Sequence, residues 1–160
     1  MRTLNAALIG CGVVGQRRVK YFGKKFTLIA CADKNINKIK KLFNKKNCLL
    51  TNDWKKILKV NNLNAVFIST FHTDQSKIIK AFLKKNIHIF CEKPGGTSSK
   101  ETFRLLKLAK KKKKLSIKIG YNHRFHPSFI LAKKMILENK IGKIINIRAV
   151  YGHGGRKNYH

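Results

Sequence analysis

The stretch from Asn5 to Gly15, Asn-Ala-Ala-Leu-Ile-Gly-Cys-Gly-Val-Val-Gly, decides the fold. Its first half is a short apolar strand, and its second half places glycines at positions 10, 12 and 15 around the start of a helix near Val13. A strand-to-helix turn this tight needs glycine where the backbone bends and where a phosphate group approaches main-chain N–H groups. The first turn of the helix then offers unpaired N–H donors and a partial positive charge. The stretch therefore predicts a phosphate-binding turn.

A second apolar strand ends at Asp33, 23 residues after Gly10. Dinucleotide-binding units carry an acid about 20 residues beyond their first glycine, where its carboxylate accepts hydrogen bonds from a ribose. NAD is the expected cofactor, because Asp33 repels a 2′-phosphate, while the adjacent Lys34 leaves NADP open. A glycine-rich turn without a ligand is the alternative. The predicted cofactor residues in this unit are Gly10, Cys11, Gly12, Val13, Val14, Gly15, Asp33 and Lys34.

Strand and helix patterns alternate along the chain without a linker. Apolar strands are expected at residues 6–10, 27–32, 65–70, 87–91 and 115–120, with a weaker one near 48–50. Amphipathic helices are expected at residues 13–22, 35–45, 54–59, 75–85 and 98–113. Strands that are apolar on both faces, with helices between them, imply a parallel sheet covered on both sides. Right-handed crossovers then predict an α/β doubly wound Rossmann fold.

Unusual polar residues follow the carboxyl ends of these strands, which is the edge where open α/β sheets bind ligands. Thr70 and His72 follow one strand, Glu92 and Lys93 follow the next, and the segment 122–127 follows the last. We therefore expect Thr70, His72, Glu92 and Lys93 to lie beside the cofactor.

Lys93 has the clearest chemical use. A cationic nicotinamide ring nearby and partial burial favour its neutral amine. That amine can hold or exchange the proton of a substrate hydroxyl while hydride leaves the adjacent carbon. Pro94 restricts the turn that aims Lys93, and Glu92 either orients Lys93 or binds ribose hydroxyls. A plain surface turn is the alternative interpretation of Glu92-Lys93-Pro94.

Three segments follow one another along the chain: Ala-Leu-Ile-Gly-Cys-Gly at 7–12, Cys-Glu-Lys-Pro-Gly at 91–95 and Gly-Tyr-Asn-His-Arg-Phe-His-Pro at 120–127. Together they resemble the signatures of the Gfo/Idh/MocA family, which includes glucose–fructose oxidoreductase and inositol 2-dehydrogenase. The resemblance implies a nicotinamide-dependent oxidoreductase acting on a hydroxyl of a sugar, cyclitol or nucleotide sugar, with Lys93 in proton transfer. It also implies that residues 124–127 lie beside nicotinamide and substrate. Arg124 is thus a cofactor-binding candidate and His126 a catalytic one, with turn packing as the alternative for His126.

The chain departs from the family pattern at two places. The family often carries Thr-Pro-x-x-x-His after the fourth strand, whereas Thr70 is followed by Phe71, and position 75 is Gln. His72 therefore either takes a different role or caps a turn. The family also continues into a second domain, an open mixed sheet. Residues 1–122 are interpreted as the Rossmann domain and 123–160 as the start of that second domain, with its first strand at 143–151. The resemblance implies that this chain alone binds cofactor with little or no turnover, and that full-length members form homo-oligomers.

The charge of the chain is abnormal. Lys and Arg total 37 against 6 Asp and Glu, so the formal net charge is +31. A chain this basic attracts polyanions by counterion release. The lysines are scattered over most of the expected helices, however, and the one dense run, Lys110–Lys114, falls at a helix end, where cations suit the dipole. A dinucleotide-binding module without catalysis and a polyanion- or nucleic-acid-binding protein remain the alternatives to an oxidoreductase.

The remaining composition favours a cytoplasmic protein. No run of about 20 apolar residues occurs, so no membrane span is expected. The first four residues lead directly into a strand and leave no room for a signal peptide. The four cysteines, at 11, 31, 48 and 91, form no CxxC pair, so buried reduced thiols are expected rather than a metal site or disulfides.

Overall fold

The computed structural model describes residues 3–43, 47–150 and 152. The chain divides into two compact units, residues 1–121 and residues 122–160.

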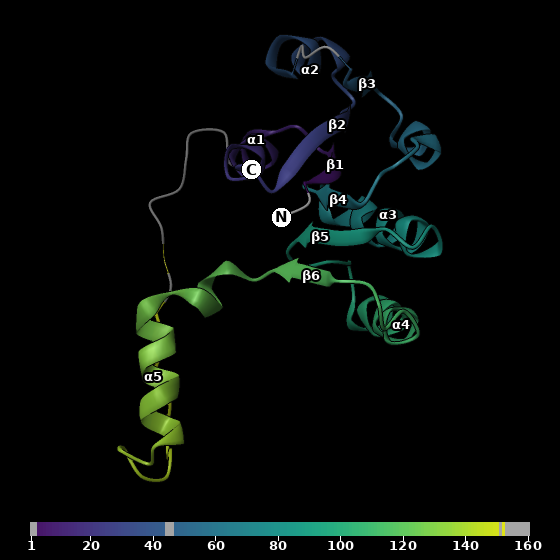
Figure 1. The fold of residues 1–160 in the computed structure, drawn as a ribbon. Helices are drawn as coiled ribbons and strands as arrows, with labels where there is room; N and C mark the ends of the chain where they lie inside the picture. Colours follow the sequence, from purple (N-terminus) through teal and green to yellow (C-terminus); the bar gives the residue numbers. More distant parts are fainter. Residues whose placement is uncertain (1–2, 44–46, 151, 153–160) are drawn as a thin grey trace. The chain divides into compact units, whose positions relative to one another are not determined.

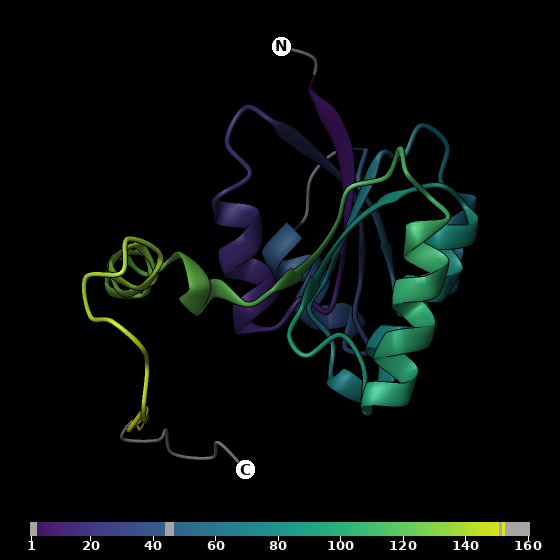
Figure 2. The same cartoon turned by 90° about the horizontal axis from the view of Figure 1, so that it is seen from below.

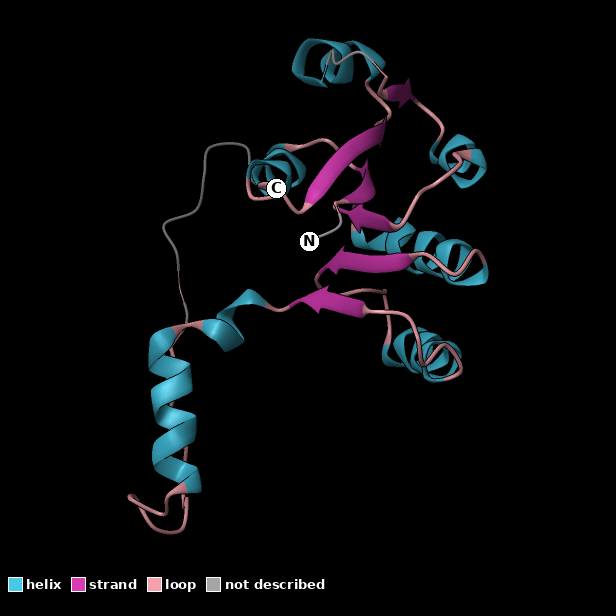
Figure 3. Cartoon of the chain, in the orientation of Figure 1, coloured by secondary structure: helices cyan, strands magenta, loops and turns pink. Residues whose placement is uncertain are grey.

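The first unit is built on a six-stranded sheet in the order β3-β2-β1-β4-β5-β6 (Figures 1 and 3). All five neighbouring pairs are parallel. The strand order reverses beside β1, whose two neighbours are β2 and β4, and this is the switch point at which doubly wound sheets bind ligands. The strands are Leu4–Ile9 (β1), Phe26–Ala32 (β2), Leu49–Thr51 (β3), Ala65–Ile68 (β4), His88–Glu92 (β5) and Ile117–Gly120 (β6).

Helices cover both faces of the sheet (Figure 2). On one face, α1 and α2 pack through side chains such as Val19 and Ile39 against Leu8 of β1. On the other face, η1, α3 and α4 pack against Val66 of β4, with Phe82 of α3 fully buried. The predicted doubly wound Rossmann fold is therefore confirmed. The helical elements are Val13–Lys20 (α1), Ile36–Phe43 (α2), Trp54–Lys59 (η1, a 3₁₀ helix), His72–Lys84 (α3) and Ser99–Lys110 (α4).

Two boundaries on the ligand edge differ from expectation. Strand β4 ends at Ile68, two residues before the predicted end, and α3 begins at His72 rather than at Gln75. Phe71 is the N-cap of α3 and makes no side-chain capping bond. His72 is the first helical residue, so it does not cap this helix.

Three of the cysteine side chains are buried, and all four are free thiols. The neighbouring thiols of Cys11 and Cys48, together with burial, raise the pKa of the Cys31 thiol. Burial, aided by the charge of Glu92, raises the pKa of the Cys91 thiol to about 12. The buried thiols serve as small apolar core groups in the turn after β1 (Cys11), on β2 (Cys31) and on β5 (Cys91).

The second unit corrects one prediction and adds one helix. Its elements are η2, Asn122–Phe125, and α5, Pro127–Leu137. Sequence reasoning did not predict α5. The strand expected at 143–151 is not formed by the described residues 143–150, because none of them pairs with another strand; position 151 lies outside the described residues.

Helix α4 ends at Lys110, with Lys111 as its C-cap, so the lysine run lies at a helix carboxyl end, as predicted. Among the helices of the described residues, none combines the length and apolar character needed to cross a bilayer.

Candidate functional site

The turn between β1 and α1 contains two glycines that the fold itself requires. Gly10 has φ +87°, and a Cβ there would lie 2.5 Å from the carbonyl oxygen of Ser69. A Cβ on Gly15 would overlap the carbonyl oxygen of Gly10. Both positions therefore exclude side chains through contacts within the protein, as the glycine motif predicts.

Gly12 is different, because no contact among the described residues explains it. It has an ordinary extended backbone, φ −67°, and, its two chain neighbours aside, no atom of the described residues lies within 4 Å of the position its Cβ would take. Gly12 is also the N-cap of α1, where a Ser, Thr, Asp or Asn side chain would normally accept from the first-turn N–H groups, and no side-chain cap is present. The result is an open space in front of uncapped helix donors, which is the arrangement that binds a phosphate.

Asp33 is held at the end of β2 by the same turn. Its Oδ2 accepts from the backbone N–H of Cys11 at 2.7 Å, and its Oδ1 accepts from that of Asn35 at 3.0 Å. These bonds orient the carboxylate, and each oxygen keeps a further lone pair for a ligand hydroxyl. Asp33 therefore braces the glycine turn and also lines a groove that opens over it.

A groove of about 490 Å³ opens over these residues. Trp54 and the 81% exposed Phe71 supply aromatic walls, and Asp74 adds a second carboxylate. Seven of the predicted cofactor residues line it: Gly10, Gly12, Val13, Val14, Asp33, Lys34 and Thr70. Cys11 and Gly15 are buried beneath the turn, while His72, Glu92 and Lys93 are not part of the groove lining.

Two buried hydroxyl groups beside the groove have no hydrogen-bond partner among the described residues. They are Ser69 Oγ and Thr70 Oγ1, in the loop that follows β4. Buried polar atoms are nearly always paired, so such atoms in a groove lining point to a ligand that pairs them. Together with the space at Gly12, they show that the residues present fit a dinucleotide.

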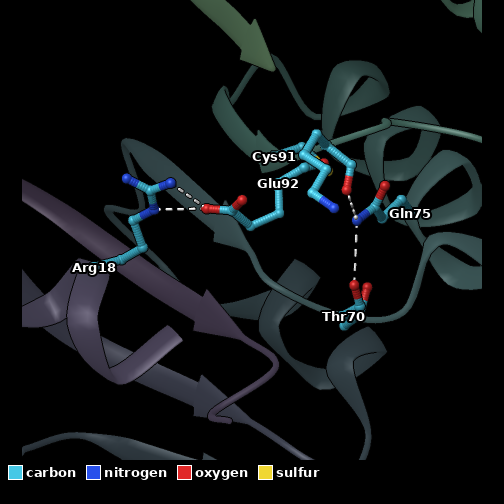
Figure 4. A network of polar contacts seen from close by, with 6 residues as sticks. Arg18, Thr70, Gln75, Cys91 and Glu92 are labelled. Carbon is cyan, nitrogen blue, oxygen red and sulfur yellow. Dashed lines mark hydrogen bonds and ion pairs between the residues drawn. The ribbon is translucent and has the colours of Figure 1, made fainter. Parts of the chain in front are cut away.

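Glu92 is engaged by Arg18 rather than by Lys93 (Figure 4). Arg18 Nε donates to Glu92 Oε1 at 2.6 Å, and Arg18 Nη2 donates to the same oxygen. The guanidinium also lies 4.7 Å from the ring centroid of Phe90. The ion pair thus ties α1, which follows the glycine turn, to the end of β5.

Gln75 is a functional candidate that sequence reasoning noted only as a departure from the family pattern. It is 1% exposed, and its Nε2 donates to the carbonyl oxygens of Thr70, at 3.2 Å, and Lys93, at 3.4 Å. Its Oε1 accepts from the N–H of Gly95 at 2.8 Å. One side chain thus brings the end of the Lys93 turn close to the groove wall at Thr70 (Figure 4). The peptide bond between Lys93 and Pro94 is cis.

The candidates of the second unit lie in or next to η2. Arg124 is part of η2, and His126 is the N-cap of α5, where its Nδ1 accepts from the N–H of Ser128 at 3.3 Å. This capping bond gives His126 a local structural role. In the first unit, His88 Nδ1 accepts from the N–H of Ser116, which gives His88 a structural role as well.

The family of the chain follows from a comparison of its sequence with family models. The model GFO_IDH_MocA, described as an oxidoreductase family with an NAD-binding Rossmann fold, matches residues 4–121. The chain belongs to the Gfo/Idh/MocA family. The match covers the sheet, the glycine turn, the groove and the Lys93 turn, so the family resemblance is confirmed; the segments 7–12 and 91–95 lie inside the matched residues, and 120–127 lies mostly outside them.

Individual relatives of this Gfo/Idh/MocA chain are dehydrogenases. Levoglucosan dehydrogenase of Pseudarthrobacter phenanthrenivorans is 33% identical over 101 residues, which are 63% of this chain and 26% of that protein. The crystal structure of myo-inositol 2-dehydrogenase from Lactobacillus plantarum has a TM-score of 0.78 and 26% identity, over 90% of this chain and 44% of that one.

Scyllo-inositol dehydrogenase of Lactobacillus casei, solved with NAD(H) and scyllo-inositol, shares the fold, with a TM-score of 0.78 at 20% identity over 88% of this chain and 43% of that one. The chain therefore spans less than half the length of these relatives.

Proposed function

We propose that this chain binds NAD in the groove over the glycine turn and carries the proton-transfer residue of a dehydrogenase for sugar-type hydroxyl compounds. The observation that carries the proposal is the open space at Gly12, in front of the uncapped α1. A dinucleotide pyrophosphate there would take the free N–H donors, and its ribose hydroxyls would reach Asp33. Ser69 and Thr70 would supply two further hydroxyl groups.

NAD is preferred to NADP for an electrostatic reason. Both Asp33 and Asp74 line the groove and repel a 2′-phosphate, whereas Lys34 is the one neighbouring cation among the groove-lining residues described. The L. casei relative contains NAD(H), which supports the same choice.

Lys93 is the residue that we assign to proton transfer. In the proposed reaction, the substrate hydroxyl gives its proton to the Lys93 amine, the carbon bearing it loses a hydride, and the C–O bond becomes a carbonyl. The bound nicotinamide supplies the hydride acceptor. Lys93 is exposed at the carboxyl end of β5, where the sequence predicted partial burial, and its backbone is bonded to Gln75 beside the groove. The inositol and levoglucosan dehydrogenases among the relatives support a polyhydroxylated substrate.

The second unit has a proposed part in the same reaction. Arg124 would contact the cofactor and His126 the substrate, within a domain that begins at residue 123 and that, in longer members, carries the contacts of a homo-oligomer. The high net charge would add salt-sensitive binding of polyanions that does not involve the groove. This division predicts cofactor binding without substantial turnover by the chain as it stands.

The test is a titration with NADH and NADPH, followed by energy transfer from Trp54. Trp54 is the single tryptophan and lines the groove, so its signal reports on this site. Saturable NADH binding that survives about 0.3 M salt supports the proposal, because contacts to phosphates alone weaken strongly at that salt. Binding that salt abolishes, or that heparin competes away, would instead favour the polyanion-binding alternative.

A further inference from the structure

The side-chain amide of Gln75 joins two loops that follow different strands. The nitrogen carries two hydrogens and donates to Thr70 O after β4 and to Lys93 O after β5, while the oxygen accepts from Gly95 N–H. The bonding pattern uses both donors and the acceptor of the amide. Gln75 is 1% exposed, so solvent does not replace these bonds.

The Lys93 turn is held from its other sides as well. Tyr121 Oη donates to the carbonyl oxygen of Pro94 at 3.2 Å, and the side chain of Glu92 is bonded to Arg18. Gly95 has φ +88°, and a Cβ there would lie 3.0 Å from the side chain of Ile119. Of the residues that hold this turn, Gln75 also reaches the groove, because it is bonded to Thr70.

The chemistry of the site specifies an amide. Two carbonyl oxygens and one N–H face the same buried side chain, so the partner must give two hydrogen bonds and take one. A carboxylate has no hydrogen to donate and would face two acceptors. A thioether donates no hydrogen bond and accepts only weakly. Either replacement leaves buried backbone groups unpaired, which costs more than the bonds themselves are worth.

We propose that Gln75 is a positioning residue: it fixes the distance between the cofactor groove at Thr70 and the turn that carries Lys93. This inference rests on the proposed function and deepens it. A proton-transfer group acts only within hydrogen-bond reach of the substrate, so a shift of the Lys93 turn relative to the groove reduces the rate even when the cofactor binds normally.

The first measurement concerns the bond itself and needs no cofactor. Gln75→Met keeps the side-chain length and removes every polar atom. We expect hydrogen exchange at the Gly95 amide to accelerate about tenfold or more, as the loss of a buried hydrogen bond predicts. Asn64→Leu is the matched control, because Asn64 Oδ1 accepts from the N–H of Asn5 at 2.8 Å at the opposite edge of the sheet. The control should leave Gly95 exchange unchanged.

The second measurement reports on Lys93. Each protein is acetylated briefly with acetic anhydride, with and without saturating NADH, and modification of Lys93 is compared by mass spectrometry with that of Lys100. In the wild type we expect NADH to slow acetylation of Lys93 about fivefold or more, and in Gln75→Met less than about twofold, because the turn that carries Lys93 is no longer bonded to the groove wall. The NADH dissociation constants of the two proteins should agree within about threefold, because the groove donors of α1 are untouched.

The outcomes separate the two proposals. Full NADH protection of Lys93 in Gln75→Met, or unchanged Gly95 exchange, overturns the role of Gln75 and leaves the cofactor site standing. A wild-type chain that does not bind NADH overturns the proposed function, and with it the catalytic purpose of the bond.

If Gln75→Met does not fold, Gln75→Glu replaces it: this variant keeps the acceptor for Gly95 and regains one donor when protonated. NADH protection of its Lys93 should then return as the pH is lowered, and protection independent of pH contradicts the positioning role.

Discussion

Arg18 of α1 and Glu92 of β5, 74 residues apart in the chain, form an ion pair in which two nitrogens of the guanidinium donate to one carboxylate oxygen. The side chains are 25% and 13% exposed. The pair ties the helix that follows the glycine turn to the strand that ends beside Lys93. The glycine turn and the Lys93 turn are thus joined by a contact that neither sequence segment, 7–12 or 91–95, reveals by itself.

Removing Arg18 should therefore cost stability. Arg18→Met keeps an apolar contact with Phe90 and leaves the largely buried Glu92 carboxylate unpaired, so we expect a loss of about 1–3 kcal/mol in the free energy of unfolding by urea. Lys112→Met is the control, since Lys112 makes an exposed bond to Asn86, and its cost should stay below about 0.5 kcal/mol. Equal losses in the two variants would mean that the Arg18–Glu92 pair is solvated and contributes nothing.

The glycines of the turn should separate into two classes. Gly12→Ala places its Cβ in open space with an allowed backbone, so its unfolding free energy should change by less than about 1 kcal/mol. The same methyl occupies the space assigned to the pyrophosphate, so NADH binding should weaken about tenfold or more. In Gly10→Ala, by contrast, the new methyl group meets the Ser69 carbonyl, so the free energy of unfolding should fall by several kcal/mol. The strained backbone alone accounts for about 1–3 kcal/mol of this loss, and the overlap adds to it. A stable Gly12→Ala chain with unchanged NADH affinity would show that the open space is not a phosphate site.

Local sequence patterns were sufficient to predict the sheet and the glycine turn. Each buried strand carries its own apolar run, and Gly10 and Gly15 are required by atoms within the same βα unit or its neighbour β4. The roles of Gln75 and Arg18 were beyond such reasoning. Each depends on which strands become neighbours, and the partners lie 18 and 74 residues away.

The structure of the second unit was harder to predict from the sequence, for a different reason. In α5, Phe129, Ile130 and Leu131 follow one another and are all more than half exposed, so no apolar stripe marks the helix. Residues 143–150 carry the isoleucines typical of a strand, but a strand forms only with a partner to pair with.

The first turn of α4 should make stability depend on pH. The backbone N–H of Thr97, then its hydroxyl, and then the hydroxyl of Ser76 hold the pKa of Glu101 below its usual value of about 4.5. A carboxyl group with a lowered folded-state pKa stabilises the fold above the unfolded value, and the contribution is lost as pH falls through the folded value. The stability difference between wild type and Glu101→Gln should therefore be present at pH 6 and vanish in acid.

Thermal unfolding from pH 3 to pH 7 measures this difference. Ser98→Ala provides the comparison, because Ser98 Oγ accepts from the N–H of Glu101 at any pH in this range. Its cost, about 1 kcal/mol, should not depend on pH. A Glu101→Gln difference that persists at pH 3 would place its origin in packing rather than in charge.

The four thiols should react in two classes. Attack on a disulfide reagent needs a thiolate and access to solvent, and Cys11, Cys31 and Cys91 are buried, with raised pKa values for Cys31 and Cys91. Only the partly exposed Cys48 should react within minutes with 5,5′-dithiobis(2-nitrobenzoate) at pH 8, and all four should react after denaturation in guanidinium. Cys48→Ser should abolish the fast phase, which assigns it. If Cys11 reacts rapidly instead, the turn that carries Gly12 opens in solution, and NADH, by filling the groove above it, should then slow that reaction.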